Sequence, residues 1–232
     1  MCIRDRLTIS NGQVTISGTI QNDQGIGLEN VVIDVTGSVV LSTNTDASGF
    51  YSVVVPSGSN VTVTPTKDTN HKNGLSALDA AIVQALANNT ASTTLIPTPT
   101  RRIAADPNES ESITVADAGI ISFVNVISGA TFHNPPGFDV NSWVFVDAAH
   151  VFTNPLDPWN NPFADALTYS NITSDQIAQN YTGIKIGDVT GDADVTLLSS
   201  NGDSRSQDLL FTIQEQGFEA GTEVSILSLI HI

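Results

Sequence analysis

The chain of 232 residues is long enough for one large domain or two small ones. Its 24 acidic and 8 basic residues give a formal net charge of −16, which disfavours binding to nucleic acid and to anionic membrane surfaces but favours divalent cations. No apolar run approaches the roughly 18 residues of a membrane helix. We therefore expect a folded protein without a membrane span.

The two ends of the sequence differ from the rest. Residues 1–6 (MCIRDR) hold the only Met and the only Cys, and they resemble translated sequencing-adapter sequence, as does the terminal LSLIHI. We leave both segments out of the fold prediction. Without Cys2 the chain has no disulfide framework, and its many Thr, Ser, Asn and Asp residues favour an extracellular bacterial protein, secreted or on the cell surface.

Residues 7–66 alternate between apolar and polar side chains in short runs such as VTISGTI and GFYSVVVP, with Gly, Asn and Asp between them. This pattern predicts a small antiparallel β-sandwich. The segment from Gly18 to Thr66 resembles the carboxypeptidase regulatory-like and collagen-adhesin B-type modules of secreted bacterial proteins. The resemblance implies a spacer.

Residues 67–130 contain an internal repeat, since Asp106 and Asp117 follow Asp68 and Asp79 at the same separation of 38 residues. Ser76 and Thr114 each precede a carboxylate by three residues, which predicts a capped helix start in both copies. Apolar residues at helical spacing then predict one buried stripe on each helix, made of Leu75, Leu78, Ile82 and Leu86 in the first copy and Ile113, Ile120, Val124 and Ile127 in the second.

The spacing of the oxygen-bearing residues is typical of a twelve-residue loop that wraps Ca²⁺. The second copy offers an oxygen ligand at every expected place, namely Asp106, Asn108, Ser110, the Ser112 carbonyl, Thr114 and Asp117. The first copy offers Asp68, Asn70, the Gly74 carbonyl, Ser76 and Asp79, but Lys72 stands at its fifth place. In the second copy Glu111 occupies the sixth place, where a sharp turn favours Gly. We expect calcium in the second loop, with tighter binding there than in the first, where Lys72 leaves binding open.

Two such loops, each followed by one helix, resemble the type I dockerin from Asp68 to Gly129. Dockerins bind calcium and dock on cohesin modules through residues just after the ninth loop position. The resemblance implies a docking face made of Ala77, Leu78, Val115 and Ala116, with a cohesin-like or other protein module as partner.

Residues 131–194 are predicted to form a β-rich extension that packs on the dockerin-like module. The runs SWVFVDAAHVFTNP and YTGIKIGDVTG resemble the segment that follows dockerin repeats in secreted proteins of Bacteroidetes type. GDVTGDADV indicates an ordinary acidic turn, since no helical stripe follows it. Residues 195–232 are predicted to be a linker and the start of a further β-sandwich. The fold class is therefore mainly β with a small α part.

The chemistry of the 131–194 segment leaves alternatives open. Its aromatic residues fit either a sugar-stacking platform or a small core over the helix pair: they are Trp143, Phe145, Phe152, Trp159 and Phe163. Its Asp residues stand in Pro- and Asn-rich turns without a nucleophile-and-base motif, so we expect no enzyme activity. The predicted function is a non-catalytic, calcium-binding assembly module. The alternative is a carbohydrate-binding or accessory part of a polysaccharide-degrading enzyme whose catalytic domain lies outside this chain.

Overall fold

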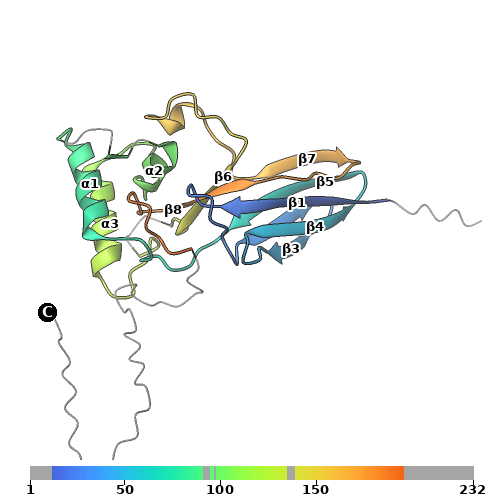
Figure 1. The fold of residues 1–232 in the computed structure, drawn as a ribbon, viewed down its shortest axis with the longest axis horizontal. Coiled ribbons are helices and arrows are strands. Elements are labelled where there is room, and N and C mark those ends of the chain that lie inside the picture. The colour runs from blue at the N-terminus through green and yellow to red at the C-terminus, as the bar shows by residue number, and fades with distance from the viewer. Residues whose placement is uncertain (1–11, 91–94, 97, 135–138, 196–232) are drawn as a thin grey trace, which may run out of the picture.

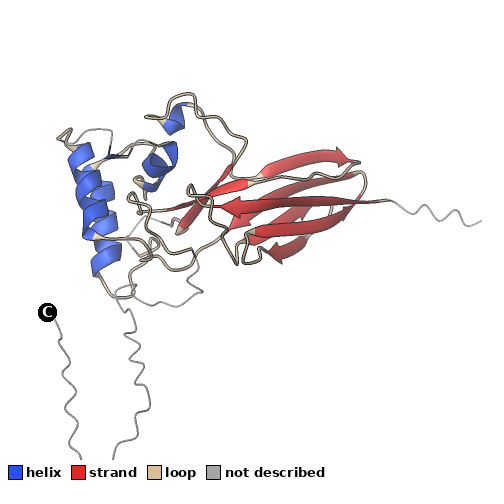
Figure 2. Ribbon diagram, in the orientation of Figure 1, coloured by secondary structure: helices blue, strands red, loops and turns tan. Residues whose placement is uncertain are grey.

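A computed structural model describes residues 12–90, 95–96, 98–134 and 139–195. The adapter-like ends lie outside these residues, as does the predicted further sandwich beyond Val195. The described part is mainly β with a few helices, as the sequence predicts (Figure 2). In chain order the elements are β1 (Gln13–Gln21), β2 (Val32–Gly37), β3 (Leu41–Asn44), β4 (Phe50–Pro56), β5 (Ser59–Thr66), α1 (Ala77–Ala87), α2 (Pro99–Ala104), α3 (Val115–Val126), β6 (Trp143–Asp147), the short 3₁₀ helix η2 (Pro158–Asn160), β7 (Leu167–Ile172) and β8 (Tyr181–Lys185). No helix among the described residues has the length and hydropathy that a membrane crossing requires.

Two four-stranded sheets form the β part, with strand orders β4-β1-β8-β6 and β3-β2-β5-β7 (Figure 1). The alternation that predicted β1 has a direct physical counterpart, because Val14, Ile16 and Ile20 are buried between the sheets. β4 and β5 alternate in the same way, and together these strands enclose one core.

The β-rich extension supplies strands to both sheets. β8 pairs parallel to β1 through Ile20 and Tyr181, whereas β7 pairs antiparallel to β5. The Tyr181 hydroxyl donates to the Val63 carbonyl at 3.0 Å, so the phenol crosses from one sheet to the other. Segments far apart in the sequence thus complete the sandwich that residues 7–66 were predicted to form.

The two helices begin where their caps predict, α1 directly after Ser76 and α3 directly after Thr114. Six of the eight residues of the predicted stripes lie in the core or pack against it, and the other two, Leu78 and Ile127, are exposed. Leu78 is 60% exposed, because α1 turns Asp79 and Val83 inward and the neighbouring position points about 100° away. Ile127 is also exposed, since α3 ends at Val126.

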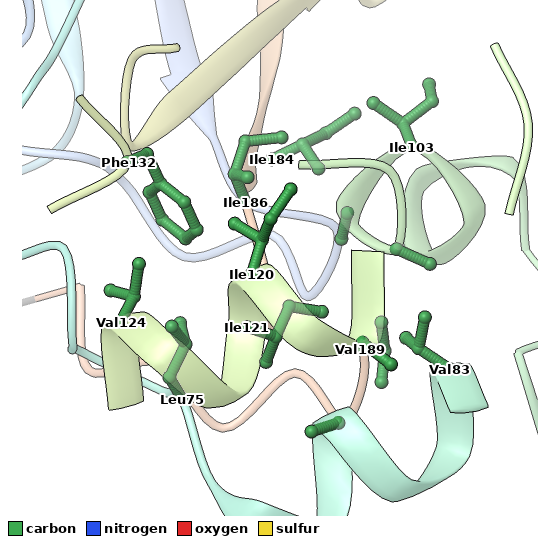
Figure 3. Packing of buried hydrophobic residues seen from close by; sticks show 14 of the residues in the cluster. Leu75, Val83, Ile103, Ile120, Ile121, Val124, Phe132, Ile184, Ile186 and Val189 are labelled. Atoms are coloured by element: carbon green, nitrogen blue, oxygen red, sulfur yellow. The ribbon is translucent and has the colours of Figure 1, made fainter. Parts of the chain in front are cut away.

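A second core lies between the helices and the end of the sheets (Figure 3). Val83 from α1 and Ile121 and Val124 from α3 are fully buried there. Ile184 and Ile186, at the end of β8, complete this core. β8 therefore contributes to both cores, with Tyr181 in the sandwich and its last residues against the helices.

Lys185 is a buried cation at the point where the two cores meet. Its Nζ donates to the carbonyls of His71 at 3.1 Å and Ser142 at 3.2 Å, and it lies 5.4 Å from the centre of the Phe132 ring. Burial lowers the pKa of Lys185 to about 7. The side chain thus ties the start of the first repeat to the strand that follows the second.

We predict that Lys185 makes the stability of the protein depend on pH. Between pH 7 and about 9 the unfolded chain binds a proton that the folded amine gives up, so the free energy of unfolding rises with pH by at most about 1.4 kcal/mol per unit. Lys185→Met should remove this rise. Urea unfolding of both proteins at several pH values measures the difference, and equal pH dependence in the two would contradict the prediction.

Candidate functional site

The second predicted loop brings two carboxylates together in the protein interior. Asp106 follows α2 and is 3% exposed, while Asp117, in the first turn of α3, is fully buried. The carboxylate of Asp106 is encircled by its own loop, since Oδ1 accepts from the Ser110 amide at 3.0 Å and Oδ2 from the Glu111 amide at 2.8 Å.

Asp117 has one satisfied oxygen and one without a partner. Its Oδ2 accepts from the amide and the hydroxyl of Thr114 at 2.7 and 2.8 Å, as a helix-capping carboxylate does. Its Oδ1 is buried and has no hydrogen-bond partner among the described residues. A buried carboxylate oxygen in this state is costly unless a cation or a donor reaches it.

The electrostatics of this pair oppose full ionisation. The pKa of Asp106 is raised to about 6, mainly by burial and in smaller part by the charge of Asp117, against the lowering effect of the loop hydrogen bonds. Burial also raises the pKa of Asp117. Two carboxylates held in this way are suited to a divalent cation, which removes the repulsion and takes oxygen ligands.

Three of the remaining predicted ligands of the second loop lie near Asp106 or contact one another. Asn108 Oδ1 and Asp106 Oδ1 share the Ser110 amide, and the Ser110 hydroxyl lies within hydrogen-bond distance of the Ser112 carbonyl. Glu109 and Glu111 have φ angles of 53° and 60°, so the loop adopts left-handed backbone at two glutamates. Such backbone is uncommon for Glu. It is stabilised here by the hydrogen bonds that the Ser110 and Glu111 amides donate to Asp106.

The first predicted loop is arranged differently. Asp68 faces away from α1, since its Oδ2 lies 2.7 Å from Nε2 of His133 and its Oδ1 accepts from the Ser142 amide at 2.8 Å. Asn70 and Gly74 have positive φ, as two tight turns require. Among the described residues, Asp68 makes no hydrogen bond or ion pair with the capping residues Ser76 and Asp79.

Asp79 is satisfied by a distant turn. Its Oδ2 accepts from the Ser76 amide at 2.8 Å, while its Oδ1 accepts from the amides of Val189 and Thr190, both at 3.0 Å. This turn is the GDVTGDADV segment, in which Asp188 accepts from the amides four and five residues ahead. Asp106 accepts from amides at the same two offsets, so the two acidic turns share one local geometry.

A cluster of Asp68, His71 and His133 was not predicted, because the histidines are far apart in the sequence. One ligand atom from each lies within 4.8 Å of the others. The Phe132 amide donates to Nδ1 of His71 at 3.3 Å, so Nε2 of this ring carries the proton and points to Asp68 at 3.4 Å. In this tautomer the Nε2–H of His71 lies near the carboxylate, which His133 contacts at 2.7 Å. A cation bound at Nε2 of His71 would have to displace this proton.

The four residues of the predicted docking face are all exposed. Ala77 and Leu78 stand in the first turn of α1, and Val115 and Ala116 stand in the first turn of α3. Leu78 and Val115 are 60% and 54% exposed, as are several other large apolar side chains of the described residues. The face is accessible to a partner.

A comparison with protein families, with curated proteins and with solved structures finds no match for this chain.

We predict that the two histidines of the cluster titrate far apart. Burial lowers the pKa of His71 to about 4, whereas the hydrogen bond to Asp68 raises the pKa of His133 above its ordinary value of 6.5. NMR titration of the imidazole resonances measures both. Asp68→Asn should lower the pKa of His133, and coincident titration of the two rings near pH 6.5 would show that the cluster does not form.

Proposed function

We propose that the chain is a non-catalytic, calcium-binding assembly module of a secreted or cell-surface bacterial protein. One observation carries the calcium proposal: the buried Oδ1 of Asp117 has no partner among the described residues, and its charge acts on the buried carboxylate of Asp106. A cation bound there would satisfy the oxygen and offset the repulsion.

Calcium suits this loop better than other divalent cations. The proposed ligands are all oxygen atoms, which excludes a preference for the softer transition metals. They come from a mixture of carboxylates, hydroxyls, an amide and a carbonyl within one loop, and Ca²⁺ accepts such irregular sets more readily than Mg²⁺ does. The proposed set is Asp106, Asn108, Ser110, the Ser112 carbonyl, Thr114 and Asp117.

In the first repeat, the proposed ligands Asp68, Asn70, Gly74, Ser76 and Asp79 make a weaker site. A cation at Asp79 would have to replace the amides of Val189 and Thr190, which already satisfy its Oδ1. A cation at Asp68 would likewise compete with His133 and Ser142. Calcium should therefore bind the second loop first.

The assembly role rests on the resemblance to type I dockerins and on the exposed docking residues. Ala77, Leu78, Val115 and Ala116 place small and apolar side chains at the starts of two helices that pack on each other. A cohesin-like module is the proposed partner. The rival function, a carbohydrate-binding or accessory part of an enzyme whose catalytic domain lies elsewhere, requires direct glycan binding by this chain.

Matched variants test the calcium proposal. Calcium at 100-fold excess over its dissociation constant should add about 2.7 kcal/mol to the stability of the wild type. Asp117→Asn should abolish this gain but leave the metal-free protein at least as stable, because it removes one of two repelling charges. Asp79→Asn should destabilise the metal-free protein but keep the calcium gain. Thermal unfolding with calcium and with chelator measures both effects.

Two results would overturn the calcium proposal. One is a wild-type melting curve that calcium and chelator leave unchanged. The other is loss of the calcium gain in Asp79→Asn together with its retention in Asp117→Asn, which would move the site to the first repeat.

The docking face has its own test. In calcium, Val115→Glu should weaken binding to a cohesin module by at least about tenfold, since it buries a charge in an apolar interface. Val40→Glu is the matched control, because Val40 is 81% exposed and lies outside the helices. Surface plasmon resonance against a panel of cohesin modules gives the affinities. Equal effects of the two variants, or no binding by any module, would contradict the docking proposal.

A further inference from the structure

A groove of about 470 Å³ opens beside the second loop, between the end of β5, β6 and the segment after η2. Two of its walls are aromatic. Trp143 and Phe145 belong to β6, whereas Trp159 lies in η2 and Phe163 follows it. Of these, Trp143 and Phe145 are also part of the sandwich core, whereas Trp159 and Phe163 are only half-buried.

The rim of the groove is acidic. Glu109 and Glu111 reach it from the second loop, Asp165 reaches it from the segment after η2, and all three are exposed. Asp106 also lines the groove, but calcium in the loop would offset its charge. No lysine or arginine is among the lining residues in the described part of the chain.

Trp143 lines the groove but leaves little of itself open, since its side chain is 4% exposed and its Nε1 is buried. The rings that a ligand can reach more readily are those of Trp159 and Phe163, which are half-buried. A ligand for this groove would therefore offer positive charge for the rim and contact with these two rings.

We propose that this groove binds a basic segment of a partner protein, with a lysine or arginine side chain between the rim carboxylates. The half-buried rings of Trp159 and Phe163 favour such a cation, because the faces of Trp and Phe rings attract it. The Trp143 ring already lies 6.0 Å from Nζ of Lys185, so it contributes less. A neutral glycan can stack on the same rings, but it leaves three carboxylates without compensating charge, so charge complementarity favours the basic peptide.

This site lies outside the proposed docking face and outside the proposed ligands of the first loop. Asp165 is the most informative residue, since it belongs to neither calcium loop and its replacement leaves the proposed metal site intact. The test is therefore independent of the calcium proposal.

The chain carries its own reporter, because both of its tryptophans line the groove. Tryptophan fluorescence of the full chain in calcium would be titrated with acetyl-Gly-Arg-Gly-amide and with its uncharged citrulline analogue. The arginine peptide should give a saturable change that weakens with added salt, and the citrulline peptide should bind about tenfold more weakly. Cello-oligosaccharides and mannan-oligosaccharides serve as the glycan probes.

Asp165→Asn should weaken binding of the arginine peptide by about threefold to tenfold, and Asp34→Asn, an equal charge change on β2, should leave it unaltered. Equal binding of the arginine and citrulline peptides, equal effects of the two variants, or no saturable change at all would overturn the proposal. Saturable binding of an oligosaccharide without any preference for the arginine peptide would also overturn it and would make the groove a glycan site.

Discussion

The helical part of this protein depends on how two buried carboxylates are satisfied. Asp79 and Asp117 each occupy the third position of a helix. In each, one carboxylate oxygen accepts a hydrogen bond from the amide of the capping residue. The second oxygen differs. Distant amides serve Asp79, whereas Asp117 has no such donor among the described residues. Since an ionised carboxylate is costly to bury alone, this difference determines where a cation would contribute most.

β8 and the turn after it connect the hydrogen bonding of Asp79 to the rest of the fold. The strand enters the sandwich at Tyr181, carries Lys185 to the carbonyls of His71 and Ser142, and then turns so that the amides after Asp188 reach α1. One short segment therefore supplies a strand, a buried amine and two donors for Asp79 of α1. A change that displaces β8 would disturb both cores, because residues of β8 belong to each of them.

Local chemistry explains which features the sequence predicts. The caps at Ser76 and Thr114 mark the helix starts because each involves residues only three apart, and alternation marks β1 because its period is short. The pairing of β1 with β8 and the partners of Asp68 lack such a signature, since they join residues far apart in the chain. GDVTGDADV was predicted to be an ordinary acidic turn, and only the structure shows that Asp188 accepts from amides at the same offsets as Asp106.

The two acidic turns differ in how far they lie along the chain from the helix that each of them contacts. The turn at Asp106 is joined to α3 within eleven residues, whereas the turn at Asp188 reaches α1 across 110 residues. Closing the longer loop costs about 2 kcal/mol more entropy, if both behave as flexible chains. The distant turn, however, arrives with amides already directed at Asp79. The local turn forms at lower cost but leaves Oδ1 of Asp117 without a donor among the described residues. The first helix therefore depends on the completed sandwich for its stability, and the second would gain from the cation proposed for its own loop.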